Sequence, residues 1–197
     1  MATTPVPDVL TRSQHARRGR VIDAAIDLAR EGGYDAVQMR DVSARAGVAL
    51  GTVYRYFSSK DHLLSAALLE WTSRIDAAPL ARALSKNKGA PVDRLVAVIR
   101  RFTSVTAAEP VLFAAFVTAI TKPDPAVLES QALIQDIVRA VLSPPLEDID
   151  PDVRAGIVRV LTHVWFASLL GWVNGWTAMG QVADELEFAG RLLLRDT

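Results

Sequence analysis

The sequence predicts an all-α protein, with an N-terminal head of three helices followed by a larger C-terminal helical bundle. Apolar residues recur at helical spacing along the chain, and strand signals are nearly absent. A short glycine turn at Ala46-Gly47-Val48 joins two short helical patterns, which is the arrangement of a helix-turn-helix. Half of the 197 residues are hydrophobic, so the chain can bury a core of its own.

The predicted head begins after a polar N-terminal arm, residues 1–12, which we expect to be disordered. Gly32-Gly33 ends the first helix, because glycine readily takes the left-handed conformation found at helix ends. Ser58, three residues before Asp61, indicates a capping box at the start of a fourth helix. The first four helices are expected over about residues 13–30, 40–46, 50–57 and 60–77.

Proline or glycine separates most of the helices expected in the bundle. The stretch that precedes them, residues 78–91, contains Lys86-Asn87-Lys88-Gly89 and is predicted to be a mobile connection. The bundle helices are expected over about residues 92–107, 110–121, 125–142, 152–176 and 180–194.

Charge and composition narrow the class of function. The net charge is zero, yet residues 11–60 hold nine Lys or Arg against five Asp or Glu. Residues 63–197 hold thirteen Lys or Arg against fifteen Asp or Glu. The positive excess therefore lies with the helix-turn-helix, as a DNA-binding head requires. The absence of cysteine favours a reducing compartment, and we expect a cytoplasmic protein.

The longest apolar stretch, residues 156–173, is interrupted by Arg159 and His163. Its uncharged part is shorter than the roughly 20 residues that a membrane span needs. We therefore expect no membrane partner.

The segment after the glycine turn carries side chains suited to DNA. Gly51 leaves the helix surface bare and permits close approach, while Tyr54 and Tyr56 can donate phenolic hydrogen bonds to phosphate. Arg55 suits a bidentate contact to guanine. Lys60 lies in the first turn of the fourth helix, where anions are favoured.

Further contacts are expected on either side of this segment. Ala49 and Leu50 can meet a thymine methyl. Arg17, Arg18 and Arg20 can reach phosphates or a minor groove from the first helix. The turn alone leaves open a plain helical corner with half-buried tyrosines.

Residues 15–65 resemble the TetR family of bacterial transcriptional repressors. The glycine turn, the run from Gly51 to Phe57, and then Lys60 and Leu63 match the N-terminal signature of that family. The resemblance implies a DNA-binding domain at residues 13–60. The DNA-contacting positions that it implies are Ala49, Gly51, Thr52, Tyr54, Tyr56 and Lys60.

Two positions depart from the family pattern. Met39 stands where many members carry a Thr that caps the second helix and touches phosphate, and methionine can do neither. Ala49 stands where Ser is common, so a hydroxyl contact is lost.

The same resemblance implies that residues 61–197 form a ligand-binding domain that dimerises through its last two long helices. Small residues in the penultimate helix would let another helix approach closely, although ordinary core packing explains such a stripe equally. A homodimer also suits a two-fold operator, because one short helix reads few bases. The residues concerned are Ala167, Ser168, Gly171 and Gly175, with Val182, Leu186, Ala189, Leu192 and Leu193 on the last helix.

Aromatic and aliphatic residues on three bundle helices are expected to hold a small apolar effector, with plain core packing as the alternative for each. They are Phe102, Phe113, Phe116, Val117, Ile120, Trp165, Leu169 and Trp172. The candidates for polar contacts are Thr103, Thr118, His163 and Asn174. Few charges in these segments argue against a cationic effector. No nucleophile elbow, phosphate loop or metal-ligand spacing appears, so we expect no cofactor, metal or catalytic residues.

Three strings, GGYDAVQMRDV, GVALGTVYRYF and HVWFASLLGW, resemble the KstR branch of this family, which represses steroid catabolism genes. That branch implies a cholesterol-derived ketone or its coenzyme A thioester as the inducer, and a fatty acyl chain would suit the apolar set equally.

The sequence thus predicts a repressor that binds a palindromic operator as a dimer and is released by its effector. Tilting of the fourth helix would change the separation of the two recognition helices. A small helical enzyme and a non-switching architectural DNA binder are the alternatives.

Overall fold

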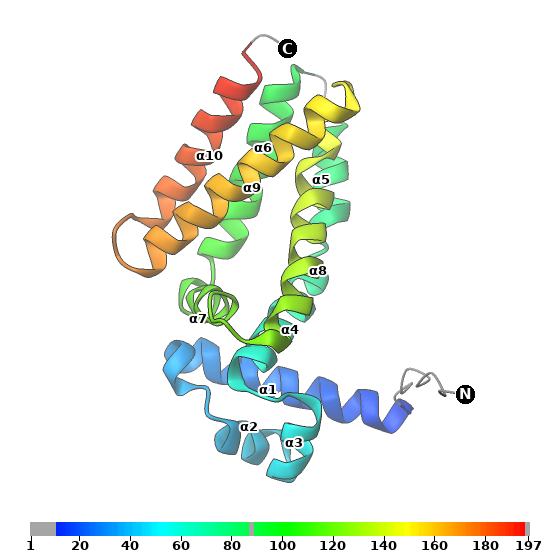
Figure 1. The fold of residues 1–197 in the computed structure, drawn as a ribbon, viewed down its shortest axis with the longest axis vertical. Coiled ribbons are helices and arrows are strands. Elements are labelled where there is room, and N and C mark those ends of the chain that lie inside the picture. The colour runs from blue at the N-terminus through cyan, green and yellow to red at the C-terminus, as the bar shows by residue number, and fades with distance from the viewer. Residues whose placement is uncertain (1–10, 87–88, 196–197) are drawn as a thin grey trace, which may run out of the picture.

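The computed structural model describes residues 11–86 and 89–195, which form ten α-helices and one 3-10 turn without a strand. In Figure 1 a small head made of α1 to α3 lies below a larger bundle, and α4 lies between the two. The all-helical architecture is therefore confirmed. Most of the predicted arm lies outside the described residues, but Thr11 caps α1 and Arg12 begins it. The domain boundaries remain a prediction.

The head contains α1 (Arg12–Ala36), α2 (Met39–Ala46) and α3 (Leu50–Tyr56). The helical backbone of α1 breaks at Gly32 and Gly33, as the sequence predicts, and Gly33 has a φ of 70°. Gly47 has a φ of 62° at the C-cap of α2, so the chain reverses there in the left-handed conformation. Val53 and Phe57, both fully buried, then hold α3 against the rest of the head.

The fourth helix, α4 (Lys60–Arg74), begins one residue later than the predicted cap requires. Ser59 is the N-cap residue, and its hydroxyl accepts a hydrogen bond from the His62 amide at 3.0 Å. Ser58 is therefore not the cap, and its own amide faces the Nδ1 of His62 at 3.3 Å. The Ser59 hydroxyl also donates to Asp124, which joins the start of α4 to the start of α8.

The predicted mobile connection at residues 78–91 is wrong, because α5 (Ala77–Ser85) occupies most of it. Pro79 lies in the first turn of α5, where a missing amide hydrogen costs little. Ala81 is buried, while the segment's other alanines and leucines favour a helix. Asn87 and Lys88 lie outside the described residues.

Four of the remaining helices begin at a proline, which has no amide hydrogen to leave unpaired. The bundle is completed by α6 (Pro91–Ala107), α7 (Pro110–Ile120), α8 (Pro125–Leu142), the 3-10 turn Pro144–Leu146, α9 (Pro151–Val173) and α10 (Met179–Leu193). Helix α9 ends before the predicted residue 176, because Gly175 turns the chain with a φ of 75°.

The packing of α1 and α4 joins the head to the bundle. Helix α1 contacts α2, α4 and α7, and α4 contacts α7 and α8 as well. Helix α10 packs on α9 and α6. By length and composition α9 would suffice to cross a membrane, and 28% of its apolar window is buried within the chain. That is weak evidence for a span, because a helix that lines an internal cavity or a subunit interface has the same composition.

Candidate DNA-binding and effector sites

The outer face of α3 presents the residues that the sequence assigns to DNA. Gly51, Tyr54 and Arg55 are exposed, and 51% of Tyr54 is accessible. Leu50 and Thr52 are half-buried at the start of the same helix, and Ala49 is its exposed N-cap. A helix anchored by Val53 on one side therefore offers a short polar and aromatic surface on the other.

Tyr56 differs from Tyr54 in its surroundings. Its hydroxyl is buried and has no hydrogen-bond partner among the described residues. The guanidinium of Arg55 lies 5.4 Å from the centre of its ring. A phosphate contact from Tyr56 would therefore require its ring to turn outward, whereas Tyr54 is already accessible.

Lys60 is engaged within the head. Its Nζ donates to the carbonyl oxygen of Tyr34 at 3.2 Å and lies 3.7 Å from the centre of the Tyr34 ring. The Tyr34 hydroxyl donates to Asp61, and burial, more than this bond, raises the pKa of Tyr34. Lys60 thus ties the start of α4 to the end of α1, close to the proposed DNA surface.

The three arginines of α1 take different positions. Arg20 donates to the carbonyl oxygen of Ala46, the last residue of α2, at 3.4 Å. Arg18 lies over the ring of Phe57 at 5.2 Å, and Arg17 bonds to Ser13 at 2.9 Å. Arg18 and Arg20 thus lie against residues of the helix-turn-helix, and Arg20 also supports the turn.

The departures at Met39 and Ala49 have visible consequences. Met39 is the first residue of α2 and is buried, while the N-cap residue Gln38 makes no capping hydrogen bond with its side chain. No side chain caps α3 either, because Ala49 has no hydroxyl.

A cavity of about 240 Å³ lies inside the bundle between α4, α6, α7, α8 and α9. Its wall is largely apolar. Six of the eight residues predicted to contact an effector line it: Phe102, Phe113, Val117, Ile120, Trp165 and Leu169. The structure therefore brings residues from three distant segments together around one space.

The other two predicted residues lie behind the wall. Phe116 is fully buried, with its ring centre 6.1 Å from that of Trp71. Trp172 stacks on Phe113 at 6.1 Å. Of the four polar candidates only His163 lines this cavity. The hydroxyls of Thr103 and Thr118 and the Asn174 amide bond to the backbone of their own helices.

Sequence reasoning missed the contributions of α4 and α8. These supply Leu68, Thr72, Gln131, Ile134, Gln135, Ile137 and Val138. The helical spacing of these residues can be seen in the sequence, but the same spacing is expected for residues that pack in the core and for residues that line a cavity.

A second, more polar cavity of about 600 Å³ adjoins the first, and the two share Gln135, Thr162 and His163. Arg139 of α8 and Arg154 and Arg159 of α9 line it, without an acidic residue among the lining. Arg139 pairs with Asp136 at 2.9 Å, and Arg154 donates to the Glu147 carbonyl at 3.2 Å. No hydrogen bond or ion pair engages Arg159 within the described chain. This site could not be predicted from the sequence, because its arginines come from two separate helices.

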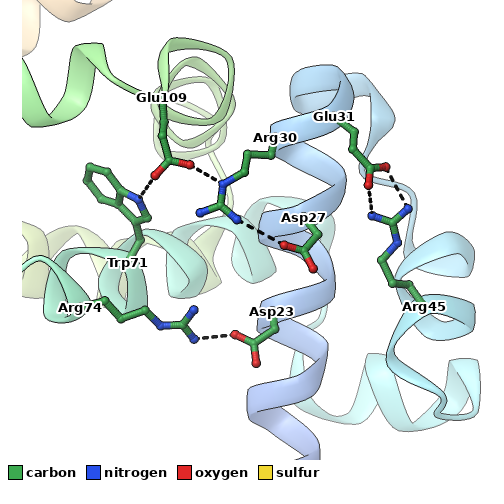
Figure 2. A network of polar contacts seen from close by, with 8 residues as sticks. All are labelled: Asp23, Asp27, Arg30, Glu31, Arg45, Trp71, Arg74 and Glu109. Atoms are coloured by element: carbon green, nitrogen blue, oxygen red, sulfur yellow. Dashed lines mark hydrogen bonds and ion pairs between the residues drawn. The ribbon is translucent and has the colours of Figure 1, made fainter.

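Figure 2 shows the polar contacts where the head meets the bundle. Glu109 accepts a hydrogen bond from the indole Nε1 of Trp71 at 3.1 Å and another from Arg30. The bond from Arg30, and to a lesser degree that from Trp71, lowers the pKa of Glu109 below the usual value for a carboxyl. Arg74 of α4 pairs separately with Asp23 of α1.

The outer face of α9 and α10 carries exposed apolar side chains. They are Val153 and Val160 on α9 and Phe188 and Leu192 on α10, with 69% of Phe188 accessible. Trp176 is exposed in the turn between these helices, and Phe166 of α9 is exposed but lines the apolar cavity. Within the predicted small-residue stripe, Gly171 is buried against Thr177 of the following turn, Gly175 lies beyond the end of α9, and Ala167 is exposed. Its role in dimerisation stays a prediction. Of the predicted stripe on α10, Val182 and Leu186 pack inside the chain, while Leu192 is exposed.

No group of three or more His, Cys, Asp or Glu in residues 11–86 and 89–195 is placed to hold a metal ion.

Comparison with known proteins gives consistent results for both halves. Residues 21–67 match the family model of bacterial regulatory proteins of the tetR family, and residues 89–193 match the tetracyclin repressor-like C-terminal domain. The HTH-type transcriptional repressor KstR of Rhodococcus jostii (strain RHA1) is 33% identical, over 99% of this chain and 91% of that protein.

Two solved structures extend the likeness to the fold. A TetR transcriptional regulator from Rhodococcus sp. RHA1 is 27% identical, with a TM-score of 0.76 over 94% of this chain and 99% of that one. Thermus thermophilus FadR, a TetR-family repressor in complex with lauroyl-CoA, is 26% identical, with a TM-score of 0.68 over 90% of this chain and 93% of that one.

Proposed function

Because this chain belongs to the TetR family of bacterial regulatory proteins and resembles KstR repressors along nearly its whole length, we propose that it is a repressor released by a large apolar effector with an anionic head. The observation that carries the proposal is the pair of cavities in the bundle that share three lining residues, one cavity apolar and the other lined by three arginines. The family consists of transcriptional regulators, so an enzyme is not proposed.

The DNA contact is assigned to the outer face of α3. Tyr54 and Arg55 are exposed there, and Gly51 offers no side chain that would hold a duplex away. Arg17 and Arg18 add charge from α1, whereas Tyr56 and Lys60 act after rearrangement of their present contacts. This surface is short, so a single copy reads few bases.

We assign the dimer interface to the exposed apolar face of α9 and α10. Val153 and Val160 are seven residues apart on α9, so they lie on one side of that helix. Phe188 and Leu192, four residues apart, form the corresponding face of α10. Covering these side chains by a second copy would pair two recognition helices with a two-fold palindromic operator.

The effector is proposed to place its apolar part in the first cavity and its anionic part among the arginines. A volume of about 240 Å³ is small for a whole ligand of ordinary size, which supports a molecule that continues into the adjoining space. Arginine suits phosphate because its donors form a planar fork. Lauroyl-CoA in the Thermus thermophilus FadR structure has this composition of apolar chain and phosphorylated head. A cholesterol-derived ketone as its coenzyme A thioester has the same two parts.

Release follows if the effector favours a different arrangement of α4. Leu68 and Thr72 of α4 line the apolar cavity, and the same helix contacts the head through α1. Because a bacterial repressor acts on operator DNA, which lies in the cytoplasm, we propose a cytoplasmic location.

The test uses an operator fragment that the purified protein selects from random-sequence DNA. Its affinity is measured by fluorescence anisotropy with saturating lauroyl-CoA, with the steroid thioester, or with coenzyme A alone. At least one thioester should weaken binding by about 5- to 150-fold, the usual range for allosteric coupling, and coenzyme A alone should not. If neither thioester changes operator affinity at saturation, the effector assignment is wrong. The two thioesters separate the steroid hypothesis from the acyl-chain hypothesis.

A further inference from the structure

The carboxylate of Glu109 lies where α1, α4 and α7 meet. Glu109 is the N-cap residue of α7, a position at which a side-chain oxygen normally accepts a hydrogen bond from the helix's own amides. Here it makes no such bond. One oxygen instead accepts from Trp71 of α4 and the other from Arg30 of α1, so a single side chain connects two helices that belong to different parts of the molecule (Figure 2).

Trp71 carries this connection to the wall of the apolar cavity. It is 4% exposed and does not line the cavity itself. Its neighbours along α4, Leu68 and Thr72, do line the cavity, and its ring centre lies 5.9 Å from that of the lining residue Phe113. A change in the position of α4 or of Phe113 therefore displaces the indole that donates to Glu109, because buried rings in a packed interior move together.

Arg30 carries the connection into the DNA-binding head. It lies in the last regular turn of α1 before the break at Gly32, and it also pairs with Asp27 of the same helix at 3.2 Å. Helix α1 packs against α2 and contacts α3. Restraining Arg30 therefore restrains the orientation of the helix on which the recognition unit rests.

A second ion pair joins the same helices without reaching the cavity. Arg74 of α4 pairs with Asp23 of α1, and each side chain is about half exposed. Neither residue lines the cavity, and Arg74 otherwise contacts Glu70 of its own helix. This pair bridges α4 and α1 as Glu109 does, but it lacks the link to the cavity wall.

We propose that Glu109 is a positioning residue that transmits occupancy of the cavity to the DNA-binding head, through Trp71 on one side and Arg30 on the other. The inference rests on the proposed effector site and adds the means by which that site acts. In the effector-free protein the carboxylate holds α1 against α4. An effector that displaces Trp71 disturbs this bond and with it the position of α1.

Glu109→Gln tests this connection with little change of shape. The amide oxygen of glutamine can still accept from Trp71, but the substituted side chain has no negative charge for Arg30. Asp23→Asn is the matched control, because it removes the charge from the ion pair of α1 with Arg74 of α4 in the same way. Trp71→Phe is the second variant, since it keeps an aromatic ring beside Phe113 and removes the N–H donor.

The measured quantity is the ratio of operator dissociation constants with and without saturating thioester, using lauroyl-CoA and the steroid thioester in parallel. Glu109→Gln should reduce this ratio by about 3- to 5-fold relative to the wild type, as expected for loss of a partly exposed charge pair. Trp71→Phe should reduce it as well, and Asp23→Asn should leave it unchanged. Thioester affinity of the DNA-free protein should not fall in Glu109→Gln, because Glu109 does not line either cavity and the effector no longer has to disturb its bond to Arg30.

An additional variant tests whether the two contacts act as one. Arg30→Gln combined with Glu109→Gln should reduce the ratio no further than Glu109→Gln alone, since both remove the same bond. If Glu109→Gln and Trp71→Phe both kept the same ratio as the wild type, the proposal would be overturned, while the effector site would remain supported. An equal reduction of this ratio in Asp23→Asn would also overturn the proposal, because losing any ion pair between the head and α4 would then reduce the coupling. If the operator dissociation constant of the wild type were the same with and without thioester, the proposed function would be refuted, and this inference with it.

Discussion

Replacing Arg159 with glutamine should weaken binding of a coenzyme A thioester without affecting the fold. Arg159 is exposed in the arginine-lined cavity, and no hydrogen bond or ion pair within the described chain engages it. Its removal therefore breaks no contact of the folded protein. Arg154 is a less suitable probe, because it also donates to the carbonyl of Glu147 and supports the start of α9.

The size of the effect follows from the exposure of Arg159. A charge-assisted hydrogen bond contributes about 1.5–3 kcal/mol when it is well formed, and an exposed ion pair contributes about 0.2–1 kcal/mol. Since Arg159 is exposed, we take about 1 kcal/mol for one arginine–phosphate contact, which corresponds to roughly a 5-fold rise in Kd. The loss should shrink at high salt, because the Debye length falls from about 10 Å at 0.1 M to about 3 Å at 1 M.

Isothermal titration calorimetry with two matched ligands provides the assay. Lauroyl-CoA carries the phosphates, whereas the lauroyl thioester of N-acetylcysteamine keeps the chain and the thioester but has none. Arg159→Gln should weaken only the first, and Arg82→Gln, an exposed arginine that lines neither cavity, should weaken neither. Equal affinity of wild type and Arg159→Gln for lauroyl-CoA would show that Arg159 does not bind the phosphates, as would an equal loss for the phosphate-free ligand.

Three further predictions concern the head and the outer face of the bundle. Tyr54→Ala should lower operator affinity while thioester affinity and dimerisation stay unchanged, since 51% of this residue is exposed; unaltered DNA binding in an anisotropy titration would remove Tyr54 from the interface. Gly47→Ala should destabilise the protein by about 1 kcal/mol, because its φ of 62° is unfavourable for alanine, whereas Gly51→Ala should not destabilise it, because that residue is helical. Thermal melting compares the two, and an equal fall in Tm would contradict the role given to the left-handed turn. Phe188→Asp should produce monomers in analytical ultracentrifugation, because a charge is placed on the proposed apolar interface, and a dimer of unchanged stability would place that interface elsewhere.

The head was largely predictable because its signals are local. The left-handed turn at Gly47 and the buried positions of Val53 and Phe57 follow from residue type and helical spacing alone. The capping serine was misplaced by one residue, because Ser58 and Ser59 are adjacent and only the start of α4 distinguishes them. The connection at residues 78–91 was misread because proline and a lysine-rich stretch outweighed the alanines and leucines that form α5.

The effector site was predictable only in part, because it depends on contacts between distant segments. Phe113 and Phe116 are three residues apart on one apolar helix, yet the first lines the cavity and the second packs behind it on Trp71. Helical spacing cannot distinguish these positions. Glu109 has no motif of its own, and its importance becomes apparent only when α1 and α4 are placed beside it.

The proposed mechanism requires the bundle cavity and the DNA-binding head to be two coupled sites. Coupling of binding free energies is reciprocal, so the effector and the operator must weaken each other by the same factor. The most direct test measures lauroyl-CoA and steroid thioester affinities for the free protein and for the protein saturated with operator DNA. We predict a Kd that rises in the complex by the same factor, about 5- to 150-fold, by which that thioester weakens operator binding. If each thioester bound the free and the DNA-bound protein with equal affinity, the two sites would not be coupled.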